Sequence, residues 1–370
     1  MNRTGTVLLE FDPRRNELSE DKKLSDGLSA VVQTGDALWV ANDETLSLER
    51  LSRQAGTGGG AICYAGHQQF PLHDFLQLPV PPKEENDKIE EADIEGLDCH
   101  GGYLWLAGSH SLKRDNPKKE NTVEKNAKRL AKIGGDGNRF LLARIPLSDD
   151  AMPSLERTVE RDGHSRTAAR LHGDAHGNEL TKALAGDEHF GPFLAIPSKD
   201  NGLDIEGLAV AGSRVFLGLR GPVLRGWAAI LELALEEQNA STLTLKPIGP
   251  NGRPYRKHFL DLKGLGVRDL CVQGDDLLVL AGPTMALTGS QTIFRWPGGA
   301  RPERESLVFA ESLPAVLDVP AGTGSGQAEG IALFDRHSGG DRSILVVYDA
   351  AKDRRRNEYT VEADLFALAG

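Results

Sequence analysis

Three short motifs with the same glutamate recur along the chain, at residues 93–97, 204–208 and 327–331. Their shared glutamates are Glu95, Glu206 and Glu329. Carboxylates gathered around one opening repel one another, so they need a cation, a basic partner, a proton or hydrogen bonds from backbone N–H groups. Because Ca²⁺ and Mg²⁺ prefer oxygen ligands, the three are candidate metal ligands and candidate catalytic residues. A purely structural role, in which each glutamate fastens neighbouring strands, is the alternative.

A second candidate group is basic. It consists of residues that follow the motifs, and of one residue that replaces the glutamate in a weaker copy: His110, Lys113, Arg114, Arg220, Arg225 and Arg268. Arginine and lysine beside backbone turns bind phosphate and carboxylate groups. We therefore expect these residues to hold an anionic small ligand. Pairing with the neighbouring carboxylates, or a solvated charged surface for the basic run 113–132, is the alternative.

Each motif opens a longer repeat that predicts a β-hairpin, because an alternating apolar run, a glycine-centred turn and a second apolar run follow one another. Two weaker copies begin at Leu28 and Val267, with Ser29 and Arg268 at the glutamate position. Successive copies lie roughly 60 residues apart, except for one interval of about 110 residues. A third and a fourth apolar run follow most copies. Four strands in each radially repeated unit are typical of a propeller blade.

The two ends of the chain are expected to meet. The last copy has three strands of its own, ending within residues 359–368, and the first apolar run, residues 6–11, has no repeat. We expect this run to complete the last blade, which removes two exposed sheet edges. The sequence thus predicts one all-β domain over residues 1–370, a β-propeller of five blades. Six blades are the alternative, if the long interval hides a further one.

The long interval contains two predicted insertions in the second blade. Residues 111–135 are rich in Lys, Asn and Glu and include a helix-like stretch at 122–133. Residues 148–190 are polar, with a second helix-like stretch at 154–162. Since the first strand of each blade lines the central channel, we expect the three glutamates to surround one mouth of that channel. The basic residues and the 148–190 insertion should lie on the same face.

Composition excludes several classes of protein. The 370 residues carry a net charge of −11, which argues against non-specific nucleic-acid binding. No apolar stretch approaches the roughly 18 residues of a membrane span. The three cysteines, Cys63, Cys99 and Cys271, have no zinc-binding spacing, and so sparse a set indicates reduced thiols and a cytoplasmic protein. Phosphate-binding loops, nucleophile elbows and zinc-protease motifs are not found.

The motifs resemble those of a bacterial family, the domain of unknown function 3616, and of the propellers labelled esterase-like phytase and SdiA-regulated. Residues 93–97, 204–208, 329–331 and 108–114 carry the likeness. In similar calcium-dependent propeller hydrolases, a glutamate at this strand start holds the metal. The resemblance thus implies a calcium or magnesium site at Glu95, Glu206 and Glu329. Ser29 and Arg268 depart from the pattern, and Arg268 would oppose a cation beside it.

Two functions fit these observations. In the first, the channel mouth binds a small molecule that bears a phosphate or carboxylate group, and a divalent cation supports hydrolysis of a phosphoester or ester. In the second, the protein is a non-enzymatic scaffold whose insertions contact a protein partner. Fold resemblance does not distinguish the two.

Overall fold

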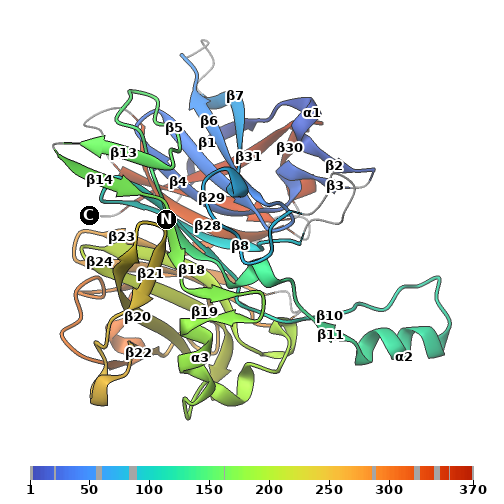
Figure 1. Cartoon of the computed structure of the whole chain (residues 1–370). Helices are drawn as coiled ribbons and strands as arrows, with labels where there is room; N and C mark the ends of the chain where they lie inside the picture. Colours follow the sequence, from blue (N-terminus) through green and yellow to red (C-terminus); the bar gives the residue numbers. More distant parts are fainter. Residues whose placement is uncertain are drawn as a thin grey trace.

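The computed structural model describes residues 3–368, apart from residues 21, 56–60, 83–89, 162, 286–288, 321–325, 337–341 and 350. The chain is built almost entirely of β-strands (Figure 1), so the predicted all-β class is confirmed. Strands that follow one another in the chain pair antiparallel, as expected for a repeat of hairpins. The architecture is propeller-like.

Antiparallel pairing groups most of the described strands into sets of four. Set 1 contains β4 (Leu28–Thr34), β5 (Ala37–Asn42), β6 (Ser47–Arg53) and β7 (Ile62–Pro71). Set 2 contains β8 (Ile94–His100), β9 (Tyr103–Gly108), β12 (Leu142–Pro146) and β15 (Ala169–Leu171). Set 3 contains β18 (Asp204–Ala211), β19 (Arg214–Leu224), β20 (Trp227–Asn239) and β22 (Tyr255–Leu260). Set 4 contains β23 (Gly266–Gln273), β24 (Asp276–Gly282), β25 (Gln291–Trp296) and β27 (Ala315–Val319). Set 5 contains β28 (Gln327–Asp335), β29 (Arg342–Asp349), β31 (Thr360–Ala367) and β1 (Arg3–Glu10).

Shorter elements decorate these sets. The helices are α1 (Pro13–Asn16), α2 (Val123–Ala131) and α3 (Glu179–Ala185). Further short strands are β2 (Glu17–Ser19), β3 (Lys22–Lys23), β10 (Lys113–Arg114), β11 (Ile133–Gly134), β13 (Thr158–Arg161), β14 (His164–Thr167), β16 (Gly173–Asp174), β17 (Gly177–Asn178), β21 (Thr242–Leu245), β26 (Ser306–Val308) and β30 (Arg355–Asn357). Among the described residues, no helix combines the length and the apolar character needed to cross a membrane.

The N-terminal strand pairs as the sequence predicts. Strand β1 runs antiparallel to β31, with Val7 opposite Ala363 and Glu10 opposite Thr360. On its other side β1 pairs in parallel with β7, so it also bridges set 5 to set 1. In Figure 1 the N-terminal blue strands accordingly lie beside the C-terminal red ones.

The first strands of the five sets contact one another in a closed cycle, in the order β4, β8, β18, β23, β28 and back to β4. Apolar clusters fill the space between neighbouring sets, for example between sets 2 and 3 and between sets 3 and 4. Polar side chains also link these inner strands. Asp98 accepts a hydrogen bond from the Val210 N–H at 2.6 Å, and Asp269 accepts one from the Ile331 N–H at 2.7 Å.

Glycine follows each motif glutamate because the inner strands approach closely. A Cβ on Gly96 would stand 2.5 Å from Leu208 Cβ, and one on Gly330 would stand 3.1 Å from the Cα of Ala30. Real side chains do not tolerate the shorter of these contacts. The Glu-Gly pair is therefore a packing requirement as well as a functional signal.

The second predicted insertion differs from expectation. Residues 148–190 do contain a helix, α3, but the stretch 154–162 contributes strand β13, which pairs with β14. The sequence Asp162-Gly163 is a hairpin signal, and Gly163 has a φ of +75°. The same segment supplies β15, which pairs with β12 in set 2. The helix expected at 122–133 is confirmed as α2.

Replacing Gly96 by alanine should destabilise the protein by about 1–3 kcal/mol or more, because the new methyl group overlaps Leu208. The matched control is Gly186→Ala, since Gly186 has open space at its Cβ position and a φ of −94°. Urea unfolding of both variants measures the difference. Equal stability of the two variants would show that the inner strands do not pack this tightly.

Candidate functional site

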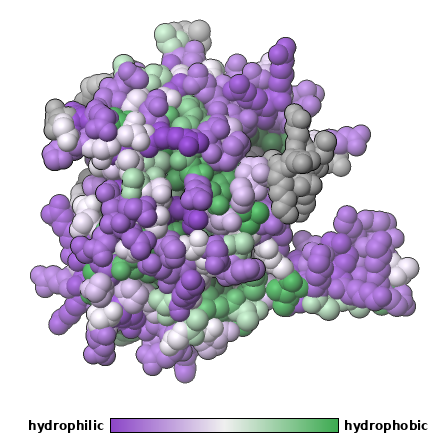
Figure 2. Space-filling view, in the orientation of Figure 1, coloured by the Kyte–Doolittle hydropathy of each residue, from purple (hydrophilic) through white to green (hydrophobic). Residues whose placement is uncertain are grey.

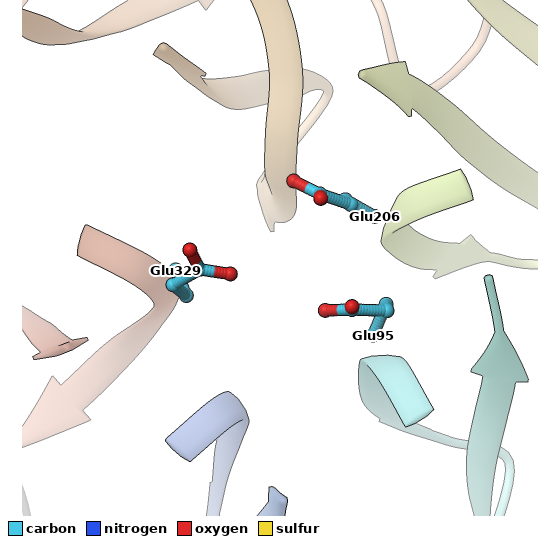
Figure 3. Close-up of side chains that lie close together, drawn as sticks. All are labelled: Glu95, Glu206 and Glu329. Carbon is cyan, nitrogen blue, oxygen red and sulfur yellow. The ribbon is translucent and has the colours of Figure 1, made fainter. Parts of the chain in front are cut away.

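The three motif glutamates converge at one place. Glu95, Glu206 and Glu329 lie on the inner strands β8, β18 and β28, and each offers a carboxylate oxygen within 4.8 Å of the others. In Figure 3 the three side chains point toward one another from three different strands. Glu206 is buried, and the Glu329 side chain is 13% exposed. The structure thus brings together three carboxylates that lie far apart in the sequence.

A β-bulge aims these side chains. The antiparallel register shifts between Ile94 and Gly96, and again between Ile205 and Gly207, so that each glutamate is the extra residue of its strand. The same shift occurs at Glu329 and at the two departing positions, Ser29 and Arg268. A bulge re-aims the unpaired side chain, here toward the axis. The sequence repeat therefore encodes a repeated bulge, which pattern analysis did not detect.

The departing residues fill the rest of this ring. Arg268 places Nε 3.1 Å from Glu206 Oε2 and also forms an ion pair with Glu329. Ser29 donates a hydrogen bond from Oγ to the carbonyl oxygen of Ile94 at 2.5 Å. Arg220, on β19, contacts Glu206 at 2.6 Å and Asp204. Two buried arginines therefore compensate Glu206, and one of them also holds Glu329.

Glu95 lacks such compensation. It forms no ion pair with the described residues, and burial, followed by the charge of Asp93, raises its pKa well above the ordinary value. Nearby, Asp43 has a buried Oδ1 with no hydrogen-bond partner among the described residues, and burial raises its pKa to about 8. Burial, opposed by Arg268, raises the pKa of Glu329 to about 8. Glu95 and Asp43 are thus the carboxyl groups of this ring region that have no basic partner among the described residues.

The three glutamates do not fasten neighbouring strands through the backbone. None accepts a hydrogen bond from a backbone N–H group of a described residue, whereas Asp98 and Asp269 do so across neighbouring inner strands. The structural role considered for the glutamates therefore belongs to these two aspartates. A repeated carboxylate that holds no backbone N–H group favours a ligand.

A cavity of about 470 Å³ lies over the glutamates, and we call it the mouth pocket. Its lining is highly polar: among the described residues, Leu130 is its single apolar side chain, and none of them brings an aromatic ring to it. Six lysines and arginines of this described lining face eleven carboxylates: Asp43, Glu44, Glu91, Asp93, Glu95, Asp115, Asp200, Asp204, Glu206, Glu329 and Asp349. The excess of carboxylates favours a cation.

Four of the predicted basic residues lie at this site, and each contacts a carboxylate. Lys113 lines the pocket and pairs with Glu91 at 3.0 Å and Asp136 at 2.7 Å. Arg114 also lines it and pairs with Asp200 at 2.7 Å. Arg220 and Arg268 hold the carboxylates described above. An anion that binds here must therefore compete with these ion pairs or arrive with a cation.

The other two predicted residues lie elsewhere. His110 is buried outside the pocket lining, where its ring contacts the Gly108 carbonyl and the Asn178 amide, both at 2.7 Å. Burial lowers its pKa to about 4, so it carries no charge near neutral pH. Arg225 is exposed in the turn between Leu224 and Trp227. Arg225 was predicted at the site because it follows the second strand of its hairpin. That strand, β19, extends past the pocket before the chain turns, so Arg225 lies beyond the pocket.

Several pocket residues escaped the sequence analysis. Arg139 is buried and forms ion pairs with Asp93 and Glu91. Asp204 pairs with Arg220 in the same way. The sequence did contain a signal for Asp93 and Asp204. They occupy equivalent motif positions, two residues before the motif glutamates Glu95 and Glu206. Arg139 lies outside the motifs and carried none, whereas Asp43 follows the second strand of set 1, where the repeat predicts residues around the channel mouth.

Known structures resemble the chain only distantly. The glutaminyl cyclase of Myxococcus xanthus covers 100% of both chains, with 9% identity and a TM-score of 0.39. A Thermus thermophilus protein described as a putative oxidoreductase (glucose dehydrogenase) covers 98% of this chain and 100% of its own, with 14% identity and a TM-score of 0.36. No curated protein matches the chain.

A family model does match the chain, and it spans the inner strands, the three glutamates and the described mouth-pocket lining apart from Lys22. The match covers residues 27–364. The chain therefore belongs to the family described as protein of unknown function (DUF3616), the family that its Glu-Gly motifs resemble.

Proposed function

We propose that the mouth pocket binds a divalent cation at Glu95, Glu206 and Glu329 and, through it, an anionic small molecule whose phosphoester or ester bond is hydrolysed. The convergence of three carboxylates within 4.8 Å, at the floor of a polar cavity, carries this proposal. The two sides of the site differ in charge, and each side has its own role.

The proposed scaffold is a single domain of five blades. The closed cycle of inner strands and the four-stranded sets support this count. The pairing of β1 with β31 supports one domain, because it joins both ends of the chain in one sheet. We extend the proposal to a cytoplasmic location, supported by three free cysteines.

The cation side comprises Glu95, Glu206 and Glu329, with Asp43 beside them. Calcium takes oxygen ligands at about 2.3–2.6 Å, so opposed ligands stand about 5 Å apart. The spacing of the three glutamate oxygens fits that size. Asp43 Oδ1, which is buried without a hydrogen-bond partner among the described residues, is a further oxygen on this side of the pocket. The residues present therefore fit a hard divalent cation, with Ca²⁺ or Mg²⁺ as the candidates.

The anion side comprises the basic residues Arg220, Arg268 and Lys199. Arg220 and Arg268 stay paired with Glu206. Lys199 is exposed, lines the pocket and forms no ion pair with the described residues. It can meet a phosphate or carboxylate without breaking a contact. A bound divalent cation would act as a Lewis acid toward the phosphoryl or acyl oxygen.

Glu95 is the candidate acid–base residue. Burial and the charge of Asp93 raise its pKa and so favour the protonated form, from which a general acid acts when no cation is bound. The non-enzymatic alternative, a scaffold for a protein partner, is favoured by one different observation, the projecting α2 segment.

Addition of Ca²⁺ or Mg²⁺ should raise the melting temperature by several degrees, because a ligand of the folded state stabilises it by mass action. The effect should disappear in Glu95→Gln, which removes a ligand without leaving an arginine unpaired. The exposed Glu303→Gln is the matched control and should respond like the wild type. Thermal unfolding at constant ionic strength measures this. No response to either cation, or an unchanged response in Glu95→Gln, would exclude the cation site.

Phosphate should bind more tightly when the divalent cation is present. Lys199→Ala should weaken that binding by roughly tenfold, as expected for one charge-assisted contact of about 1.5–3 kcal/mol. Arg225→Ala should leave it unchanged, because Arg225 lies in a hairpin turn outside the pocket lining. Calorimetric titration with inorganic phosphate tests this. Phosphate binding that is equally tight with and without the divalent cation would contradict the proposal that the anion binds through the cation.

Without a divalent cation, the protein should lose stability as the pH rises from about 5 to about 8.5. The folded state keeps protons on Glu95, Glu329 and Asp43, whose pKa values are raised, whereas the unfolded chain has released them above about pH 5. Glu95→Gln should therefore be more stable than the wild type at about pH 8 and show a shallower decline. Urea unfolding at several pH values measures the slopes. A wild type that gains stability over this range would contradict the assignment.

A further inference from the structure

The segment of residues 113–134 forms a separate projection, which we call the arm. It consists of β10, α2 and β11, and it extends away from the rest of the molecule (Figure 1). No residue of α2 is buried. The helix therefore gains nothing from the core of its own chain, although most helices of this length depend on such packing.

The arm nevertheless has a defined internal framework. Asn126 accepts a hydrogen bond from the Lys118 N–H and donates one to the Lys118 carbonyl, both at 2.9 Å. Thr122 caps the helix, and Arg129 donates to the Asn116 carbonyl at 2.5 Å. At its root, Arg114 is paired with Asp200. Because the arm is ordered and anchored in advance, docking it would cost little conformational entropy.

One side of the arm exposes apolar side chains. Val123 is 81% exposed, Leu130 47% and Ile133 43%. Val123, Ala127 and Leu130 share a helix face because they are spaced by about four and seven residues. Lys125 and Lys128 stand on the same helix and form no ion pair with the described residues. In Figure 2 the arm shows mainly hydrophilic colour, with apolar colour near its base.

Charge decides which surface the arm fits. Residues 113–132 carry eight Lys and Arg against three Asp and Glu, a net charge of +5, whereas the whole chain carries −11. The remainder of the chain thus carries −16. Two arms repel each other, while an arm and the body of another copy attract each other.

We propose that the arm docks on the acidic body of a second copy of this chain. The arrangement is reciprocal, with each copy lending its arm to the other around a two-fold axis. A nine-residue helix is only about 14 Å long, and a stable interface needs roughly 1,200 Å² in total. Exchange of two arms doubles the area that one arm can bury.

This arrangement goes beyond the proposed function and does not depend on it. It has one consequence for the site, because Leu130 belongs both to the exposed apolar face and to the lining of the mouth pocket. A docked partner would stand beside the pocket entrance. The arm would then link assembly to ligand access.

The mass of the full chain in solution tests the proposal. At low salt, sedimentation equilibrium should give twice the monomer mass of 39.9 kDa. At about 1 M salt the dimer should dissociate more readily, because the screening length falls to about 3 Å. The double variants Val123→Ser/Leu130→Ser and Lys125→Glu/Lys128→Glu should each weaken dimerisation at least tenfold. Their melting temperatures should match the wild type, since these side chains touch no core.

Two matched controls alter equally exposed residues elsewhere. Leu307→Ser removes an apolar side chain that is 57% exposed on β26, and Lys263→Glu reverses an exposed charge. Both should dimerise like the wild type. A wild type that stays monomeric at low salt would overturn the proposal, whatever other partner the arm binds. A dimer that withstands both arm variants would overturn it as well.

Discussion

The close approach of the inner strands around one axis governs the rest of this structure. Strands β8, β18 and β28 pack so tightly against their neighbours that a Cβ after the bulge would overlap Leu208 at Gly96 and crowd the next strand at Gly207 and Gly330. The bulge before that glycine turns one side chain per strand out of the ladder and toward the axis. The same geometry that packs the core thus crowds three carboxylates together. Tight packing and charge repulsion are two results of one backbone arrangement.

The protein compensates this repulsion unevenly. Arg220 and Arg268 neutralise Glu206, and Arg268 also reaches Glu329, so the sides contributed by sets 3 and 4 are largely balanced. On the side of sets 1 and 2, Glu95 and Asp43 have no such partner among the described residues. Leaving buried carboxylates unpaired is costly unless a proton or a cation joins them. A site that accepts a positive charge next to fixed arginines can orient an anionic group between them.

Set 2 carries both insertions of the molecule. The first of them contributes residues to the mouth pocket. The arm supplies Lys113, Arg114 and Leu130 to the pocket wall, and its return segment supplies Arg139, which binds Asp93. The second insertion is not a simple appendage, because its strand β15 completes the set and joins β21 of set 3. The pocket therefore depends on one set more than on the others.

The sequence by itself determined the all-β class, the repeat and the position of Glu95, Glu206 and Glu329 in it. It could do so because strand periodicity and a repeated Glu-Gly pair are local patterns. It also predicted helix α2, none of whose residues is buried in the core. Tertiary structure alone decided which basic residues reach the pocket. His110 turns inward to Asn178, and β19 carries Arg225 past the site. Arg139 joined the site without any motif, because its position depends on contacts between sets. Strand alternation specifies the face on which a residue lies, but the distance between two charges from different strands depends on how the strands pack around the axis.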